Sequence, residues 1–254
     1  MKRLLNLAIQ AAVAAGAEIS DVYESDFSVE HKDDKSPLTL ADKRGHLKIM
    51  SYLEKTDYPI LSEEGKHSLY EERKNWSRFW LVDPLDGTKE FVKRNGEFTV
   101  NIALIENETP IIGVIYVPVK DTLYYGSEEG AFKVEGYSSA SGVPQKMPLP
   151  KGDRSYTVVG SRSHMSIETE TFFEEMKTQH GAVEVLAVGS SLKLCMVAEG
   201  KADAYPRYAP TMEWDTGAGH AIAVAAGFQV LQYNSHEDLK YNKENLLNPW
   251  FLVK

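Results

Sequence analysis

Four segments rich in β-branched and aromatic residues follow one another between residues 97 and 135. Their sequences are EFTVNIALIE, PIIGVIYVP, DTLYYGS and GAFKVE, and turn signals such as ENETP and EEG separate them. Short strands joined by such turns usually pair with their neighbours along the chain. The sequence therefore predicts an antiparallel meander here.

The segments on either side of this meander add helices and further strands. Helices are predicted over about residues 1–23 and 40–54, and RFWLVD is a continuous apolar strand of the kind found in the centre of a sheet. After residue 153 the predicted order is YTVVGS (strand), IETETFFEEMKTQHG (helix), VEVLAV (strand), SLKLCMVAEG (helix), ADAYP (strand) and TGAGHAIAVAAG (helix), followed by FQVLQY and WFLVK. This alternation indicates layered α/β packing.

One stretch differs in composition from its surroundings. Residues 138–153, SSASGVPQKMPLPKGD, are rich in Ser, Pro and Gly and are the best candidate for an internal boundary. The length of 254 residues allows one large domain or two closely packed halves. We expect a single domain over residues 1–254, with an antiparallel-sheet half over about residues 1–140 and an α/β half over residues 153–254.

The composition is that of an ordinary globular protein, with 43% hydrophobic and 26% charged residues. The formal charge of −9 argues against a nucleic-acid polymer as partner, because such a surface needs a basic stripe. The single cysteine, Cys195, lies on an apolar helical face and is expected in the core. A chain that cannot form an internal disulfide fits a reducing cytoplasm.

The N-terminus, MKRLLNLAIQAAVAAGAEIS, has the basic start and apolar stretch of a signal peptide. Asn6 and Gln10 interrupt the apolar run, and the apolar residues instead follow one helical face. An amphipathic helix is therefore preferred, and a signal peptide is the alternative. No stretch is apolar and long enough to predict a membrane span. Peripheral association with the cytoplasmic face of the inner membrane is left open.

Acidic residues stand where apolar segments end. In LVDPLDGTKEF, Asp83 and Asp86 flank a turn directly after a predicted core strand. Glu63 and Glu64 follow PILS, and Asp215 stands at the head of a helix. Like charges this close repel unless a cation lies between them, and strand ends are where α/β proteins place ligand sites. Carboxylates without a His or Cys cluster suit Mg²⁺ or Mn²⁺ rather than zinc.

The turn after Asp83 offers further groups to a ligand. The carbonyl of Leu85 can supply another oxygen, and Gly87 lets the backbone approach closely. Residues 88–90 can open a helical turn whose free N–H groups face an anion. Taken alone, each motif has a structural alternative. DPLDG is often only a turn, SEEG is often a solvated loop, and Asp215 favours the positive end of a helix dipole.

Three motifs, in this order and spacing, resemble those of the inositol monophosphatase superfamily: SEEG, WLVDPLDGTKEF and WDTGAGHAIA. The features SPLTLAD, LVDPLDGTKEFVKRNGEFTVNIALI, SRSH, GSSLKLCMVAEG and ADAYPR are most similar to its bacterial 3'(2'),5'-bisphosphate nucleotidase branch. The resemblance covers essentially the whole chain. It implies one catalytic domain with a layered αβαβα sandwich fold, and a Mg²⁺-dependent, lithium-sensitive phosphatase.

The resemblance also assigns roles to residues. It implies two or three Mg²⁺ ions, replaceable by Mn²⁺, with ligands Glu63, Asp83, Asp86, Asp215 and the carbonyl of Leu85. Glu64 is the neighbouring acid with a less defined part. Asp42 and Thr88 are implied to activate the attacking water. The structural alternative is that Asp42 completes a capping box with Thr39 and that Thr88 caps a helix.

Substrate contacts are implied in four places, and the residues are Gly87 and Thr88, Ser161, Arg162 and His164 of SRSH, Gly189, Ser190, Ser191 and Lys193 of GSSLK, and Arg207 of YPR. A second phosphate needs cationic contacts of its own, for which Arg162, Lys193 and Arg207 are suited. The alternative for the charged residues is a solvated surface, and for GSSLK a helix start with Ser190 as the N-cap.

The resulting hypothesis is hydrolysis of the 3'-phosphate of adenosine 3',5'-bisphosphate to AMP and phosphate, with 3'-phosphoadenylyl sulfate as a further substrate. Metal-activated water is expected to attack in line. The nearest alternative is an inositol-phosphate or sugar-phosphate phosphatase on the same scaffold. A binding protein that keeps the metal site without turnover is a second alternative. The substrate is a small-molecule nucleotide bisphosphate, and a monomer and a homodimer both remain open.

Overall fold

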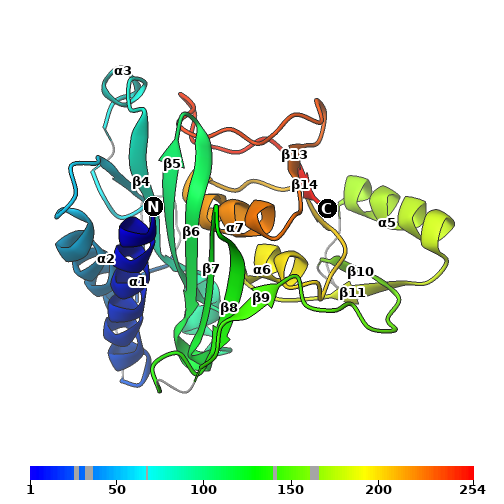
Figure 1. Ribbon diagram of the computed structural model, residues 1–254, viewed down its shortest axis with the longest axis horizontal. Helices are drawn as coiled ribbons and strands as arrows, with labels where there is room; N and C mark the ends of the chain where they lie inside the picture. The colour runs from blue at the N-terminus through cyan, green and yellow to red at the C-terminus, as the bar shows by residue number, and fades with distance from the viewer. Residues whose placement is uncertain (26–28, 32–36, 67, 140–141, 161–165) are drawn as a thin grey trace.

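The computed structural model describes the chain except for residues 26–28, 32–36, 67, 140–141 and 161–165. Its elements stack as five layers in the order helix, sheet, helix, sheet, helix (Figure 1). The predicted αβαβα sandwich is confirmed.

The largest layer is a seven-stranded sheet whose strands follow one another in chain order. The strands are β3 (Ile60–Ser62), β4 (Arg78–Asp86), β5 (Thr99–Glu106), β6 (Thr109–Val117), β7 (Thr122–Ser127), β8 (Gly130–Glu135) and β9 (Gln145–Met147). β3 and β4 are parallel, and every later pair is antiparallel, which confirms the predicted meander. β9 lies within the Ser-, Pro- and Gly-rich segment. That segment therefore adds an edge strand to the sheet, and the division of the chain into two halves stays a prediction.

The apolar run of β4 is buried on both faces of this sheet. Phe79 and Leu81 belong to the core on the side of α6 and α7, while Trp80 and Val82 belong to the core on the side of α1 and α2. Successive side chains of a strand point to opposite faces. A strand covered on both sides therefore needs an uninterrupted apolar sequence, as RFWLVD provides.

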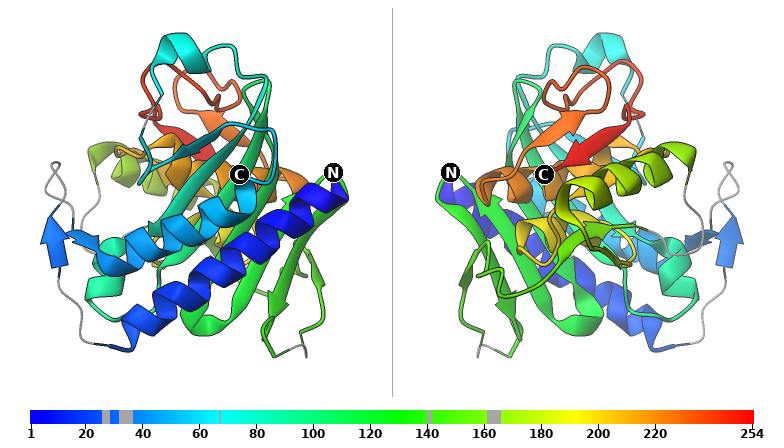
Figure 2. Two further views of the ribbon diagram at one scale, coloured as in Figure 1. Left: turned by 90° about the vertical axis from the view of Figure 1, so that its left-hand side faces the viewer. Right: turned by 90° about the vertical axis from the view of Figure 1, so that its right-hand side faces the viewer.

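The helices α1 (Lys2–Tyr23) and α2 (Leu40–Leu53) cover one face of the sheet, as the left view of Figure 2 shows. The buried face of α1 includes Leu5, Ala8, Ala12 and Ala15, which follow the predicted helical stripe. The N-terminal segment is thus part of the folded core. Within the described residues, no helix is both long and apolar enough to span a membrane.

The helices α6 (Leu192–Ala198) and α7 (Glu213–Ala225) cover the opposite face. Two sheet glycines set how closely α7 approaches. A Cβ on Gly113 would lie 2.1 Å from the carbonyl oxygen of Ala218, and a Cβ on Gly126 would lie 2.8 Å from the Cα of Ile222. α7 begins at Glu213, three residues earlier than the apolar pattern of TGAGHAIAVAAG predicts.

Two smaller sheets form the fourth layer, and α5 (Ile167–His180) forms the fifth (Figure 1). One small sheet has the order β12 (Tyr205–Arg207), β14 (Phe251–Val253), β13 (Val230–Gln232), and the other pairs β10 (Tyr156–Val159) with β11 (Val183–Leu186) in parallel. The remaining elements are the hairpin of β1 (Val29–His31) and β2 (Pro37–Thr39), the short helices α3 (Tyr70–Arg73) and α4 (Thr88–Val92), and a 3₁₀ turn at Pro118–Lys120.

Cys195 and His220 of the helical layer lie inside the core. Cys195 is fully buried in α6, as its apolar surroundings predict. His220 of α7 is buried, and its Nδ1 lies 3.0 Å from the hydroxyl of Tyr241. Burial lowers the pKa of His220 to about 3, so this histidine is neutral and packed.

Candidate active site

Three carboxylates from separate elements meet at one end of the large sheet. Glu63 directly follows β3, Asp83 lies near the end of β4, and Asp215 is in the first turn of α7. One oxygen of each lies within 4.8 Å of those of the other two. β3 and β4 are parallel, and the N–H of Glu63 donates to the carbonyl of Val82 at 3.1 Å. The two strand ends, and the acids they carry, are therefore held at one edge.

Asp86, the fourth acid of the predicted set, ends β4 and lines the same cavity as the other three. The pairing of β4 with β5 shifts register between Asp83 and Asp86, so the ladder is interrupted at this turn. Within the turn, the N–H of Leu85 donates to Asp83 Oδ1 at 3.1 Å. The backbone of the turn thus fixes the Asp83 carboxylate, and Leu85 itself lines the cavity.

Burial, together with the charges of the neighbouring acids, disfavours the ionised form of the acids in this cluster. Burial and the nearby charges of Glu63, Asp86 and Asp215 raise the pKa of Asp83 well above its ordinary range. Burial and Asp86 raise the pKa of Asp215 to about 7, although the Met212 N–H donates to it at 2.8 Å. Burial raises the pKa of Asp86 to about 6, and the charge of Lys193 opposes this. A divalent cation would remove this repulsion, and an oxygen-only donor set fits Mg²⁺ or Mn²⁺.

The glycine after the turn permits a close approach between two loops. Gly87 has a φ of 89°, in the left-handed region that favours glycine, and a Cβ there would lie 3.2 Å from the Cβ of Ser190. α4 begins at the next residue, Thr88, whose hydroxyl is 3.4 Å from the carbonyl of Leu85. Thr88 lines the cavity. The turn therefore brings the start of α4 to the acid cluster.

Asp42 lies in the first turn of α2 and is fully buried. α2 packs against β4, and the charge of Asp42 contributes to the raised pKa of Asp83. Asp42 is thus close enough to the acid cluster to act on it. That Asp42 and Thr88 together activate the attacking water stays a prediction. Thr39, the predicted helix cap, directly precedes α2.

A histidine that the sequence motifs do not include lies beside the Glu63–Glu64 pair. His46 Nδ1 is 3.0 Å from the hydroxyl of Ser62, the last residue of β3. Burial lowers the pKa of His46, although the charge of Glu64 opposes this. This places Glu64 on the His46 side, whereas Glu63 faces the other acids. No sequence spacing links residues 46 and 62, so the contact emerges only in the fold.

Ser190, Ser191 and Lys193 of the GSSLK motif line the same cavity as the acids. The N–H of Gly189 donates to Glu97 Oε2 at 2.8 Å, and Ser190 takes a positive φ of 46°. The structural alternative, with Ser190 as the N-cap, is wrong by one residue: the N-cap of α6 is Ser191, and the Leu192 N–H donates to Ser190 Oγ over a long distance of 3.5 Å. The sequence favours either serine as a cap, because serine is a common N-cap residue.

Ser191 does not use its hydroxyl for capping, because it joins a buried polar group on β5. Its Oγ donates to Asn101 Oδ1 at 2.8 Å and also lies 2.8 Å from Thr99 Oγ1. Asn101 pairs with Asp83 across the two strands. In addition, the backbone N–H of Ser191 contributes to lowering the pKa of Asp86, opposing burial. The start of α6 is thereby fixed relative to the acids.

Two cations, Lys193 and Arg207, line the same cavity as the acids. Lys193 donates to the carbonyl of Ser190 at 3.1 Å, and Arg207 donates to the carbonyl of Pro210 at 2.9 Å. Burial lowers the pKa of Lys193, the charge of Asp86 opposes this, and Arg207 adds to the lowering. Arg207 is therefore near Lys193. Two positive groups next to four acids suit a ligand that carries phosphates beyond the one bound at the acids.

Two neighbouring cavities share these cations. The first has a volume of about 420 Å³ and contains the acids. The second has a volume of about 430 Å³, and apolar residues such as Val188, Pro206 and Tyr208 contribute to its lining. Glu90, Lys193, Tyr205 and Arg207 line both. An elongated ligand can therefore place one end at the acids and a less polar end in the second cavity.

Three predicted substrate residues, Ser161, Arg162 and His164, lie outside the described residues. Their neighbours in sequence, Gly160 and Ser166, both line the second cavity. Sequence reasoning also missed Glu97 and Tyr205. Glu97 stands at the start of a predicted strand, and Tyr205 precedes the YPR arginine, so neither carried a signal of its own.

The arrangement of layers and the acid cluster are those of a known class of phosphatase. The sequence model of the inositol monophosphatase family matches residues 1–250. The chain belongs to this family, whose members are metal-dependent phosphatases.

Its similarity to individual proteins extends over the whole chain. It is 46% identical to the 3'(2'),5'-bisphosphate nucleotidase CysQ of Salmonella typhimurium, covering 98% of this chain and 99% of that protein. It is 45% identical to the protein of the same name from Escherichia coli K12, with the same coverage. The crystal structure of CysQ from Bacteroides thetaiotaomicron superposes with a TM-score of 0.89 at 50% identity, covering 99% of this chain and 97% of that one. An inositol monophosphatase from Thermotoga maritima shares the fold, with a TM-score of 0.75 at 23% identity.

Proposed function

We propose that this chain is a 3'(2'),5'-bisphosphate nucleotidase that uses Mg²⁺ to remove the 3'-phosphate of adenosine 3',5'-bisphosphate, giving AMP and phosphate. The observation that carries the proposal is the convergence of Glu63, Asp83 and Asp215 within 4.8 Å, with Asp86 lining the same cavity. The full-length relatives of this name support the choice of substrate. We propose 3'-phosphoadenylyl sulfate as a further substrate, because it carries the same 3'-phosphate.

The four acids and the carbonyl of Leu85 would hold the cations. When bound, divalent cations make water a better nucleophile and neutralise charge on the phosphate and the leaving oxygen. The buried position of Asp83 and the raised pKa values of Asp86 and Asp215 support this assignment. We propose two or three ions, with Mn²⁺ as a substitute for Mg²⁺.

The remaining steps belong to residues of the chain. Asp42 and Thr88 orient the attacking water, and the carboxylate of Asp42 accepts its proton. The backbone N–H groups of Gly87 and Thr88, at the start of α4, hold the phosphate oxygens. The buried position of Asp42 and the left-handed turn at Gly87 support these roles.

The second phosphate and the nucleoside occupy the other side of the site. Lys193 and Arg207 line both cavities, so they are placed to contact a phosphate between the acids and the nucleoside. The apolar part of the second cavity, with Val188 and Tyr208, suits the sugar and base. Inositol 1-phosphate has a single phosphate and no base, so it would leave this half of the site unused.

The test is phosphate release by the purified protein with Mg²⁺, measured in parallel on adenosine 3',5'-bisphosphate and inositol 1-phosphate. We expect kcat/KM to be at least about tenfold higher on the nucleotide, since charged hydrogen bonds to a second phosphate are worth about 1.5–3 kcal/mol. A preference for inositol 1-phosphate would instead support the inositol-phosphatase alternative.

A further inference from the structure

We propose that Glu213 is a positioning residue for Asp215, which it serves by clamping the C-terminal segment 240–248 onto the first turn of α7. This inference rests on the proposed function, because Asp215 matters only as a cation ligand. Glu213 precedes Asp215 by two residues and is fully buried. Sequence reasoning assigned it no role.

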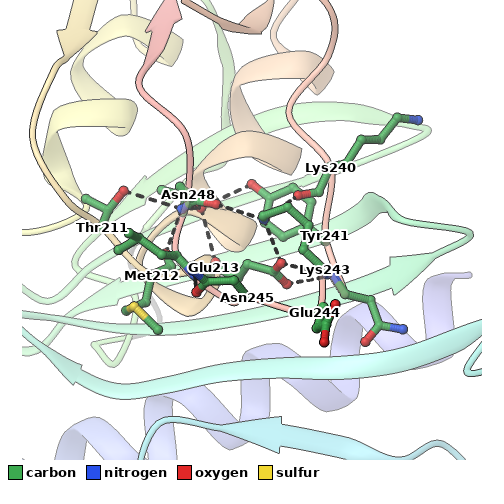
Figure 3. Close-up of polar contacts among 12 residues, drawn as sticks. Thr211, Met212, Glu213, Lys240, Tyr241, Lys243, Glu244, Asn245 and Asn248 are labelled. Atoms are coloured by element: carbon green, nitrogen blue, oxygen red, sulfur yellow. Dashed lines mark hydrogen bonds and ion pairs between the residues drawn. The ribbon is translucent and has the colours of Figure 1, made fainter. Parts of the chain in front are cut away.

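Among the described residues, the hydrogen-bond donors to the Glu213 carboxylate come from the segment that follows residue 240 (Figure 3). Oε2 accepts from the N–H of Asn242 at 2.6 Å, and Oε1 accepts from the N–H of Lys243 at 3.0 Å. The Lys243 ammonium also donates to Oε1, at 2.6 Å. A buried carboxylate is costly unless it is paired and hydrogen-bonded, and these three donors satisfy that need.

The Lys243 ammonium is itself fully used in this contact. Besides Glu213, it donates to the carbonyl of Lys240 at 2.8 Å and lies 3.3 Å from Asn248 Oδ1. The ammonium therefore connects Lys240 and Asn248, at the two ends of the segment, to Glu213 of α7. Removing the Glu213 charge would leave the ammonium without its anionic partner.

The same segment also fixes the backbone immediately before Asp215. The N–H of Glu213 donates to the carbonyl of Leu246 at 2.9 Å. Asn248 Nδ2 donates to the carbonyl of Met212 at 2.8 Å. Figure 3 shows Thr211, Met212 and Glu213 lying along the segment with Asn248 beside them. Met212 and Glu213 are thus held by Asn248 and Leu246, which lie 36 and 33 positions further along the chain.

Met212 is the link from this clamp to the cation ligand. Its N–H donates to Asp215 Oδ2 at 2.8 Å and so orients that carboxylate. Groups behind a metal ligand set its orientation and tune the affinity of the site. Glu213 fixes Met212 through the segment, and Met212 fixes Asp215.

The segment contacts α7 at Glu213 and also at Thr216, whose Oγ1 accepts from the Tyr241 hydroxyl at 3.2 Å and from Asn248 Nδ2 at 3.0 Å. The segment contains no helix and no strand, and Arg73 anchors it from another side. Arg73 donates to Asn242 Oδ1 at 2.9 Å and to the carbonyl of Glu244 at 2.8 Å. That anchor lies on α3. Glu213 and Thr216 are the residues through which the segment is hydrogen-bonded to the start of α7, and Glu213 is the charged one of the two.

The test compares Glu213→Gln with Glu199→Gln. Glu199 is a matched control, because it is equally buried and its carboxylate accepts from Lys133 at 2.7 Å and from Tyr124 at 3.0 Å. It is the C-cap of α6, at the opposite end of that helix from Ser191, whose N–H donates to Asp86. The probe is Mn²⁺ alone. Binding is followed by the electron paramagnetic resonance signal of the free ion, at a temperature where circular dichroism shows every variant folded.

We expect Glu213→Gln to bind at least one Mn²⁺ about tenfold more weakly than the wild type, as is typical when a group behind a metal ligand is changed. Glu199→Gln should lower the melting temperature but bind Mn²⁺ within twofold of the wild type. A Glu213→Gln variant that loses stability and keeps wild-type Mn²⁺ affinity would overturn the inference.

A second variant covers the case in which Glu213→Gln does not fold. Lys243→Met removes the ammonium and leaves the carboxylate with its two backbone donors, and it should also weaken Mn²⁺ binding. Unchanged Mn²⁺ affinity in Lys243→Met would overturn the inference. A wild-type protein that binds no Mn²⁺ would overturn the proposed function itself, which is a different and separately visible result.

Discussion

Replacing Asp215 with Asn is expected to make the metal-free protein more stable while abolishing its activity. Asn keeps the size of the side chain, and its carbonyl can still accept from the Met212 N–H that now donates to Asp215. What the substitution removes is a negative charge that burial and Asp86 disfavour. The acid cluster thus lowers the stability of the protein that carries no cation.

The size of this effect follows from the pKa of Asp215. That pKa is raised from 3.8 to about 7, and one pKa unit corresponds to about 1.4 kcal/mol. An acid whose folded pKa is raised lowers the free energy of unfolding as pH rises from its unfolded pKa to its folded pKa. At pH 8 the cost is therefore about 4 kcal/mol, and at pH 4 it is under about 1 kcal/mol. Neighbouring acids share protons with Asp215, so we expect a gain of about 2–4 kcal/mol at pH 8.

The assay is urea denaturation of the chelator-treated wild type and Asp215→Asn at pH 8 and pH 4, with thermal melting as a second measure. The expected rise in melting temperature at pH 8 is about 5–10 °C for a chain of this size. Added Mg²⁺ should then stabilise the wild type and leave the variant unchanged. If Asp215→Asn were less stable than the wild type at pH 8, or differed equally at both pH values, the electrostatic reasoning would be refuted.

Asp203→Asn is the matched control, with the opposite expected sign. Although burial opposes it, hydrogen bonds from Arg154 and Lys151 lower the pKa of Asp203. This carboxylate therefore stabilises the fold above its unfolded pKa, and that stabilisation is lost as pH falls through its folded pKa. Asp203→Asn should be less stable than the wild type at pH 8.

Three further predictions follow from the site and the packing. Lys193→Ala should reduce kcat/KM on adenosine 3',5'-bisphosphate about 10- to 100-fold, because a charged contact to the second phosphate is lost. The same variant should change kcat/KM much less on a simple phosphate monoester. Lys177→Ala, on the exposed side of α5, serves as control. Gly113→Ala should lower the free energy of unfolding by about 1–3 kcal/mol in urea denaturation, because its Cβ would lie 2.1 Å from the carbonyl of Ala218 and push α7 outward. An unchanged denaturation midpoint would contradict the packing argument. Mn²⁺ affinity should rise between pH 5.5 and 8, because cation binding releases protons from Asp86 and Asp215. The pKa values of these two acids are about 6 and about 7. A flat pH profile of the affinity would show that these acids are not the ligands.

The acids could be identified as candidate ligands from the sequence, because each one stands next to a segment with a strong pattern of its own. The apolar runs before Glu63 and Asp83 predict strands, and the ends of two parallel neighbouring strands must meet. Asp215 could be placed because it stands at the start of a predicted helix rich in small residues. Their approach to one another in space was predictable only in outline. The distances depend on how closely α7 packs, which glycines such as Gly113 decide.

Other parts of the molecule depend on contacts that no local pattern encodes. The partners of Glu213 are the backbone of Asn242 and the ammonium of Lys243, in a segment without periodicity, so nothing near Glu213 marks its role. β9 lies in a segment whose composition indicates a loop, and it forms because the exposed edge of β8 accepts another strand. Tertiary pairing overrode local composition in that segment.

The most direct test of the account is phosphate release from adenosine 3',5'-bisphosphate as a function of Mg²⁺ concentration, starting from protein stripped of metal by a chelator. Negligible turnover without Mg²⁺, with activity restored by adding Mg²⁺ and suppressed again by excess chelator, is the result expected if the converging acids hold the catalytic cations. Release at an equal rate with and without Mg²⁺, or no release at any Mg²⁺ concentration, would contradict it.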